Sequence, residues 1–204
     1  MESENIGILG GAFNPVHKGH LTIAREAKKE FGLSRVIFIP AAFSPFKPEA
    51  EHLPPRDRLE MLNIALKDEP DFETSEIELE RGGRSYTIDT VRELKKKHPR
   101  SRFYLIIGED NLEEIAEWKE IGRLVEICRF IVVTRPGYDL HSLKGENRRL
   151  TETILEDDRS NLLPLTLPVS STEIREELRA GRVPDDQLPE GVGEYIRSKR
   201  IFRK

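Results

Sequence analysis

The sequence contains few of the features that indicate disulfides, zinc sites, membrane spans or nucleic-acid surfaces. Cys128 is the single cysteine among 204 residues, which excludes an internal disulfide and a Cys-x-x-Cys metal or redox motif. No run of about 18 apolar residues occurs, so no membrane-spanning helix is expected. The 33 Lys and Arg against 37 Asp and Glu give a net charge of −4, which argues against a general nucleic-acid binder. The first residues are acidic rather than basic, which indicates no secretory signal peptide and predicts a cytoplasmic protein.

Short apolar segments alternate with helical patterns along most of the chain. Strands are expected at 6–9, 36–40, 72–79, 103–107, 129–134 and 161–167. Helices are expected from Lys18, after Pro54 with proline in the first turn, from a cap at Ser85 or Thr87 through Leu94, and at 171–180 and 189–198. This rhythm predicts an α/β fold with a doubly wound parallel sheet, helices on both faces and helices at the C-terminus, forming a single domain over 1–204.

The segment GGAFNPVHKGHL follows the first predicted strand and is neither a dinucleotide-binding loop nor a P-loop. Gly10 and Gly11 permit a turn and close approach of a phosphate or base to the backbone. His17 and His20 fall on one face at the start of a helix, where free N–H groups and the helix dipole favour an anion. The pattern therefore suits a phosphoryl group, although a His-x-x-His pair alone would also fit an ordinary helix start or a metal pair.

A second polar segment, VSSTEIR, follows the last predicted strand. One hydroxyl, from Ser170 or Ser171, is enough to cap the following helix. Three consecutive hydroxyl residues with Arg175 one turn later also suit a polyphosphate, because a guanidinium forms charge-assisted hydrogen bonds with phosphate oxygens. Capping and phosphate binding both remain open on this motif alone.

A lysine flanked by prolines follows the second predicted strand, in the stretch SPFKP. The prolines stiffen the chain on both sides of Lys47 and could hold its ammonium group on an extended arm over a triphosphate. The alternative is an ordinary loop lysine in water. The residue before Lys47 is Phe46.

Taken together, these motifs resemble the nucleotidyltransferase superfamily that carries a His-x-Gly-His signature and a second signature of the form [IV]SSTxIR. Three further segments narrow the resemblance: SYTIDT at 85–90, Gly108 and Asp110 with Trp118 eight residues after the aspartate, and RPG at 135–137. With these, nearly the whole chain is similar to the bacterial nicotinate-nucleotide adenylyltransferases.

The resemblance implies a Rossmann-like enzyme that transfers the adenylyl group of ATP to nicotinate mononucleotide in NAD biosynthesis, with Mg²⁺ carried by the ATP phosphates and no dedicated metal site. It implies catalytic roles for His17, His20, Lys47 and Arg175. The implied ATP site consists of Gly10, Gly11, Phe13, His20, Gly108, Asp110, Ser170, Ser171, Thr172 and Arg175. The implied mononucleotide site consists of Ala12, Phe13, Lys47, Ser85, Tyr86, Thr87, Trp118, Lys119 and Arg135.

Alternatives to this function remain open. They are adenylyl transfer to nicotinamide mononucleotide or another small phosphate ester, and a nucleotide-binding module without turnover, because fold alone does not decide chemistry. ATP and the mononucleotide are the expected partners, with neither nucleic acid nor membrane, and a homo-oligomer is compatible with the sequence.

Overall fold

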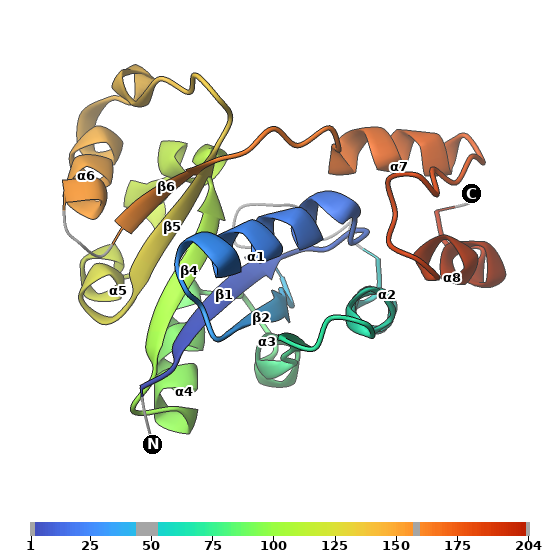
Figure 1. Cartoon of the computed structure of the whole chain (residues 1–204), viewed down its shortest axis with the longest axis horizontal. Coiled ribbons are helices and arrows are strands. Elements are labelled where there is room, and N and C mark those ends of the chain that lie inside the picture. The colour runs from blue at the N-terminus through green and yellow to red at the C-terminus, as the bar shows by residue number, and fades with distance from the viewer. Residues whose placement is uncertain (1–2, 44–52, 157–159, 203–204) are drawn as a thin grey trace.

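Six strands form one all-parallel sheet in the order β3-β2-β1-β4-β5-β6 (Figure 1). The computed structural model describes residues 3–43, 53–156 and 160–202. The two central strands carry buried apolar runs, as expected of parallel strands covered on both faces. The strands are β1 (Asn5–Gly11), β2 (Arg35–Pro40), β3 (Phe72–Thr74), β4 (Arg102–Gly108), β5 (Arg129–Thr134) and β6 (Ser160–Pro164).

Helices cover both faces of the sheet. On one face, a hydrophobic cluster joins the sheet to α1 (Lys18–Glu30), α2 (Pro55–Leu66), α7 (Ser171–Arg179) and α8 (Val192–Lys199). On the other face, a second cluster joins the sheet to α3 (Ile77–Arg81), α4 (Thr87–Lys97), α5 (Ile121–Ile127) and α6 (Gly145–Glu156). Short 3-10 turns, η2 (Glu109–Glu113), η3 (Ile115–Glu117) and η4 (Leu140–Ser142), complete the elements. The predicted doubly wound α/β fold is confirmed.

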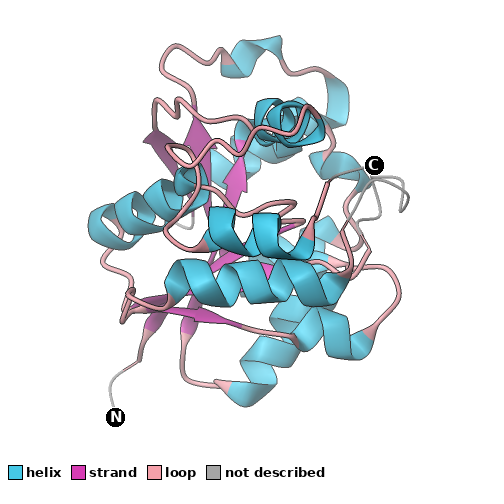
Figure 2. Cartoon of the chain, turned by 90° about the vertical axis from the view of Figure 1, so that its right-hand side faces the viewer, coloured by secondary structure: helices cyan, strands magenta, loops and turns pink. Residues whose placement is uncertain are grey.

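The last two helices lie far from the strand that precedes them. β6 is at one edge of the sheet, and the chain then runs back across the molecule to α7, which packs beside α1 (Figure 1). Figure 2 views the molecule from the side of α7 and α8, with the strands behind the helices. This return brings the second polar motif to the end of β1.

The order of the strands also determines where the site lies. The chain passes from β1 to β2 on one side, whereas β4 adds to the other side of β1. In such sheets a crevice opens at the carboxyl ends of the strands where the order reverses. Gly11 at the end of β1 and Gly108 at the end of β4 flank this point.

Three local predictions were wrong. The strand expected over 161–167 ends at Pro164. The strand expected over 72–79 ends at Thr74, and α3 begins at Ile77 because Ile77 and Glu78 are both buried, which an alternating strand does not allow. Neither Ser85 nor Thr87 caps α4. Its N-cap is Tyr86, and the Ser85 hydroxyl instead accepts a hydrogen bond from the amide of Ala42 at 2.9 Å.

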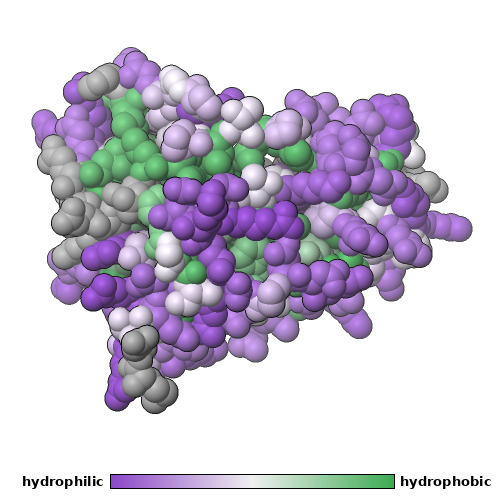
Figure 3. Space-filling model, in the orientation of Figure 1, coloured by the Kyte–Doolittle hydropathy of each residue, from purple (hydrophilic) through white to green (hydrophobic). Residues whose placement is uncertain are grey.

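The surface is largely hydrophilic on the face drawn in Figure 3, with apolar side chains gathered over β6 and the segment leading to α7. Phe43 and Leu162 are the large hydrophobic side chains most exposed among the described residues, at 38% and 43%. No helix within the described ranges is both long and apolar enough to cross a membrane.

Candidate active site

The turn after β1 forms the floor of the crevice. Gly10 is exposed although it lies in a central strand, and a Cβ there would meet no described atom within 4 Å. Phe13 is buried beneath the turn with a left-handed backbone (φ 46°), and its ring lies 3.4 Å from where a Cβ on Gly11 would be. The open position above Gly10 leaves room for a ligand to lie against the backbone.

His17 and His20 come together at the start of α1. Their rings are stacked with centroids 3.7 Å apart, and Phe13 packs edge-on against His20 with centroids 5.0 Å apart. The backbone N–H of His17 donates to Nδ1 of His20 at 3.2 Å. Because Nδ1 of His20 accepts a hydrogen bond, the proton of the neutral ring is on Nε2, which is then a donor.

Burial favours the neutral form of both imidazoles. Burial lowers the pKa of His17 to about 4, opposed by a backbone hydrogen bond and reinforced by the positive charge of Arg175. Burial, followed by the charge of His17, lowers the pKa of His20 well below its usual value. Lowered pKa values suit the two rings to hydrogen bonding as neutral imidazoles rather than to service as cations.

Gly19 is required by the position of the His17 ring. A Cβ at residue 19 would lie 3.0 Å from Nδ1 and 3.1 Å from Cε1 of His17, so the imidazole would have to shift by a few tenths of an ångström to admit it. The glycine between the two histidines thus lets the helix backbone approach the imidazole.

The start of α7 meets these histidines from the other end of the chain. The Ser170 hydroxyl caps the helix by accepting from the amide of Glu173 at 3.5 Å, so its predicted capping role is confirmed. Oγ of Ser171 lies 2.7 Å from Nε2 of His17, across 154 residues of sequence. The two polar motifs therefore form one site.

Arg175 also reaches from α7 to the floor of the crevice. Its guanidinium donates to the carbonyl oxygen of Asn14 at 3.3 Å and to the hydroxyl of Thr172 at 3.2 Å. Both acceptors are neutral, which leaves the charge of Arg175 available for a phosphate.

The N-terminus of α1 is less open than the sequence suggested. The amide of Lys18 donates to the carbonyl of Gln187 at 2.9 Å, and its ammonium group donates to the carbonyl of Asp186 at 2.6 Å. The loop before α8 therefore covers one of the N–H groups that had been expected to face an anion. The side chains of His17 and His20 remain as donors at this end.

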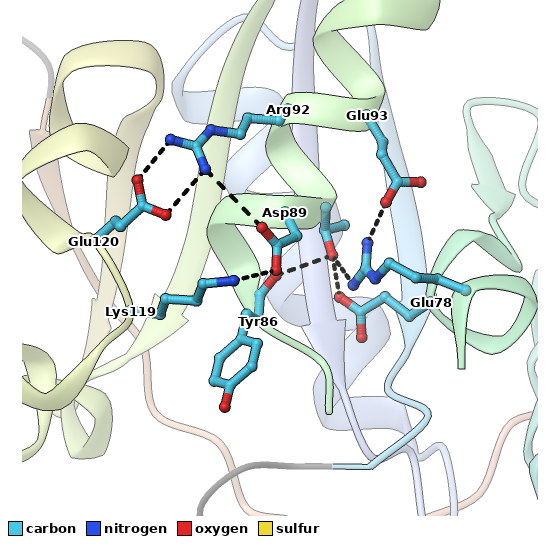
Figure 4. Close-up of polar contacts among 9 residues, drawn as sticks. Glu78, Tyr86, Asp89, Arg92, Glu93, Lys119 and Glu120 are labelled. Atoms are coloured by element: carbon cyan, nitrogen blue, oxygen red, sulfur yellow. Dashed lines mark hydrogen bonds and ion pairs between the residues drawn. The ribbon is translucent and has the colours of Figure 1, made fainter. Parts of the chain in front are cut away.

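A second group of predicted residues lies at the start of α4 and in the segment before α5 (Figure 4). The Lys119 ammonium lies 2.8 Å from a carboxylate oxygen of Asp89 and 4.7 Å from the ring centroid of Tyr86. Trp118 is half-buried and packs against the same hydrophobic cluster as Tyr86. Thr87 is the first residue of α4. The structure thus joins the predicted residues of SYTIDT to those around Trp118.

The segment after β4 forms a third group. Asp110 is exposed in η2, and its carboxylate occupies the space that a Cβ on Gly108 would need. Glu109 accepts from the backbone N–H of Arg135 at 2.8 Å and lies 3.5 Å from its guanidinium. The Arg135 side chain is otherwise in solvent, at 89% exposed. Lys47, the remaining predicted catalytic residue, lies outside the described residues.

Sequence reasoning missed Arg58, which is 1% exposed on α2. Its guanidinium donates to three backbone carbonyls: Leu53 at 3.1 Å, Ala12 at 2.9 Å and Ala41 at 2.7 Å. Ala12 follows the end of β1 and Ala41 follows the end of β2. Arg58 therefore links the segments that follow these two strands. The available signal was an arginine on the apolar face of α2, in register with Met61, Leu62 and Ala65.

Within the described part of the chain, no three His, Cys, Asp or Glu side chains are grouped so that they could hold a metal ion. Cys128 is buried, and burial raises its pKa to about 12, so its thiol is not a nucleophile.

Comparisons with known proteins agree with this geometry. The cytidylyltransferase-like family model matches residues 8–177. A protein of Citrifermentans bemidjiense named probable nicotinate-nucleotide adenylyltransferase is 39% identical over 97% of each chain. A Moorella thermoacetica protein of the same name is 38% identical over 97% of this chain and 91% of its own length.

Among solved structures, the Plasmodium falciparum nicotinic acid mononucleotide adenylyltransferase complexed with NaAD superposes with a TM-score of 0.75. It is 21% identical and the match covers 98% of this chain and 97% of that one, which supports the fold. The family match and the full-length relatives show that this chain belongs to the cytidylyltransferase-like family and, within it, to the nicotinate-nucleotide adenylyltransferases.

Proposed function

We propose that the protein transfers the adenylyl group of ATP to nicotinate mononucleotide and produces deamido-NAD and pyrophosphate. The contact between Nε2 of His17 and Oγ of Ser171 carries this proposal, because it unites two phosphate-binding motifs at the end of β1. The names of the full-length relatives agree with it.

The reaction is an in-line displacement at the α-phosphorus of ATP. A phosphate oxygen of the mononucleotide forms the new O–P bond, the bond to the β-phosphate oxygen breaks, and pyrophosphate leaves with the electron pair. The nucleophile is already an anion, so no general base is needed. The protein supplies position and charge stabilisation.

Each polar group has a role in this scheme. The Nε2–H of His20 donates to an α-phosphate oxygen, and His17 with Ser171 holds the neighbouring β-phosphate. Arg175 and Thr172 exchange their mutual hydrogen bond, 3.2 Å long, for the β- and γ-phosphates. Gly10 and Gly11 let the nucleotides lie on the backbone, and Lys47 is the proposed cation at the triphosphate.

The ATP and mononucleotide sides have separate walls. Gly108 and Asp110 take the ATP side, where a carboxylate suits ribose hydroxyls. The mononucleotide contacts the start of α4 and the segment with Trp118, which together form the substrate wall. It also contacts Ala12, Phe13, Ser85 and Arg135. Mg²⁺ enters as part of the substrate MgATP, held by phosphate oxygens and water, which are the hard ligands it prefers. The single-domain organisation, the cytoplasmic location and self-association remain predictions of the sequence.

Charge favours the acid over the amide. Two of the nearby carboxylates are paired with arginines: Glu120 with Arg92 at 2.7 Å and Glu109 with Arg135 at 3.5 Å. The N-terminus of α4 adds about 0.3–1 kcal/mol for an anion, and donors left unpaired by an amide cost about 1–3 kcal/mol. We expect kcat/KM for nicotinate mononucleotide to exceed that for nicotinamide mononucleotide by about tenfold or more.

Pyrophosphate release tests the proposal with ATP and either mononucleotide or phosphopantetheine. His20→Ala should lower turnover by about 100-fold or more, the scale for losing one preorganised donor. His98→Ala, at the far end of α4, is the matched histidine control and should leave turnover unchanged. No release with any substrate would favour a binding module, and preference for the amide would overturn the substrate assignment alone.

A further inference from the structure

Glu120 has an unusual backbone between the Trp118 segment and α5. Its φ of 52° and ψ of 42° lie in the left-handed region, which residues with side chains rarely adopt. Its carbonyl accepts the amides of Arg123 at 2.9 Å and Leu124 at 3.0 Å, which begins α5. Strain of this kind persists where surrounding contacts hold it and often marks a functional segment.

The contacts that hold Glu120 come from α4. Arg92 donates to both carboxylate oxygens of Glu120, at 3.1 and 2.7 Å (Figure 4). Asp89 lies 2.8 Å from the Lys119 ammonium and 4.0 Å from the Arg92 guanidinium, so the four charges alternate in sign. Two successive residues after Trp118 are therefore paired with one face of α4.

The opposite flank of α4 is anchored in the protein. The Thr90 hydroxyl donates to Glu78 at 2.6 Å and accepts from Arg81 at 2.9 Å. Thr90 and Glu78 are 2% and 7% exposed. By contrast, the Arg92 and Glu120 side chains are 42% and 40% exposed. α4 is thus the fixed element, and the surface pairs hold the Trp118 segment against it.

We propose that Arg92 is a positioning residue for the mononucleotide: its paired hydrogen bonds with Glu120 hold Trp118 and the Lys119 backbone at the substrate wall. This inference rests on the proposed function. A surface ion pair contributes little to global stability, so its effect should appear in the position of this segment rather than in unfolding.

Arg92→Met and Glu120→Gln test the role in kinetics. Each should raise KM for nicotinate mononucleotide by about two- to fivefold, while kcat and KM for ATP change by less than about twofold. The double variant should be no worse than either single variant, because both remove one interaction. Arg92→Lys should restore part of the affinity. In salt of about 1 M, wild type and variants should converge.

Trp118 provides a readout that does not depend on turnover, because it is the single tryptophan of the chain. Acrylamide should quench its fluorescence more strongly in Arg92→Met than in wild type, at an unchanged melting temperature. Arg148→Met is the matched control, since Arg148 forms a similar exposed pair with Glu152 at 2.7 Å on α6.

The outcomes separate the two proposals. Unchanged quenching and KM in an active Arg92→Met enzyme would overturn the positioning role, as would equal changes in both Michaelis constants. A wild type that turns over neither mononucleotide, but shows the quenching difference, would instead overturn the proposed function and with it the substrate assigned to this wall.

Discussion

Lowering the pH from 7.5 to 5 should destabilise the protein through His17. This imidazole is 6% exposed, and its pKa falls from 6.5 to about 4. Burial is the main cause, a backbone hydrogen bond opposes it, and the charge of Arg175 adds to it. A protonated His17 is therefore unfavourable in the folded chain, whereas the unfolded chain accepts the proton freely.

The sign and size of this change in the free energy of unfolding follow from the pKa of His17 in the unfolded chain, 6.5, and in the folded chain, about 4. Between pH 4 and 6.5 the unfolded state binds more protons than the folded state, so stability falls as the pH drops through this window. Each unit of pKa shift corresponds to about 1.36 kcal/mol, which makes the full loss about 3 kcal/mol and the loss by pH 5 about 2 kcal/mol.

Urea unfolding of wild type and His17→Asn at pH 7.5 and 5 measures this effect. Carboxylates and His20 titrate in both proteins, so the difference between their losses reports His17 together with its effect on the pKa of His20. Wild type should lose about 2 kcal/mol more than the variant. An equal loss in both proteins, or an NMR titration of His17 with a midpoint near 6.5, would refute the reasoning.

Three other substitutions, one of them with a matched control, test individual contacts. Gly19→Ala should lower kcat/KM by about tenfold or more, because its Cβ would lie 3.0 Å from Nδ1 of His17. Gly122→Ala on α5, where a Cβ meets no described atom within 4 Å, should keep full activity and add up to about 1 kcal/mol of stability; equal activity of the two variants would contradict the close approach. Ser171→Ala removes the 2.7 Å contact with His17 and should lower kcat/KM by about tenfold, whereas unchanged kinetics would show that the contact is incidental. Arg58→Met leaves three backbone carbonyls without their donor and should cost about 3 kcal/mol in urea unfolding; a loss below about 1 kcal/mol would mean that water replaces the guanidinium.

Most elements of the fold could be predicted from local sequence patterns. The apolar run of β4, the proline at the start of α2 and the Ser170 cap of α7 were all readable, because each depends on residues within one element. The pattern at 72–79 misled because alternation over a few residues does not distinguish a short edge strand followed by a helix from one longer strand. Ile77 and Glu78 are consecutive and both buried, which a helix allows and an alternating strand does not.

The family, the two polar motifs and the parallel α/β fold could be predicted from the sequence, since they depend on residue types at short, regular spacings. Which of these groups come into contact could be learned from the three-dimensional structure alone. Ser171 contacts His17, and the carbonyl of Gln187 accepts the amide of Lys18. Arg58 donates to the carbonyl of Ala12, and Arg92 donates to the carboxylate of Glu120. These contacts depend on the strand order and on the path of the chain from β6 to α7, which packs beside α1. Both bring together residues that are far apart in the sequence, and no local sequence pattern reports such contacts.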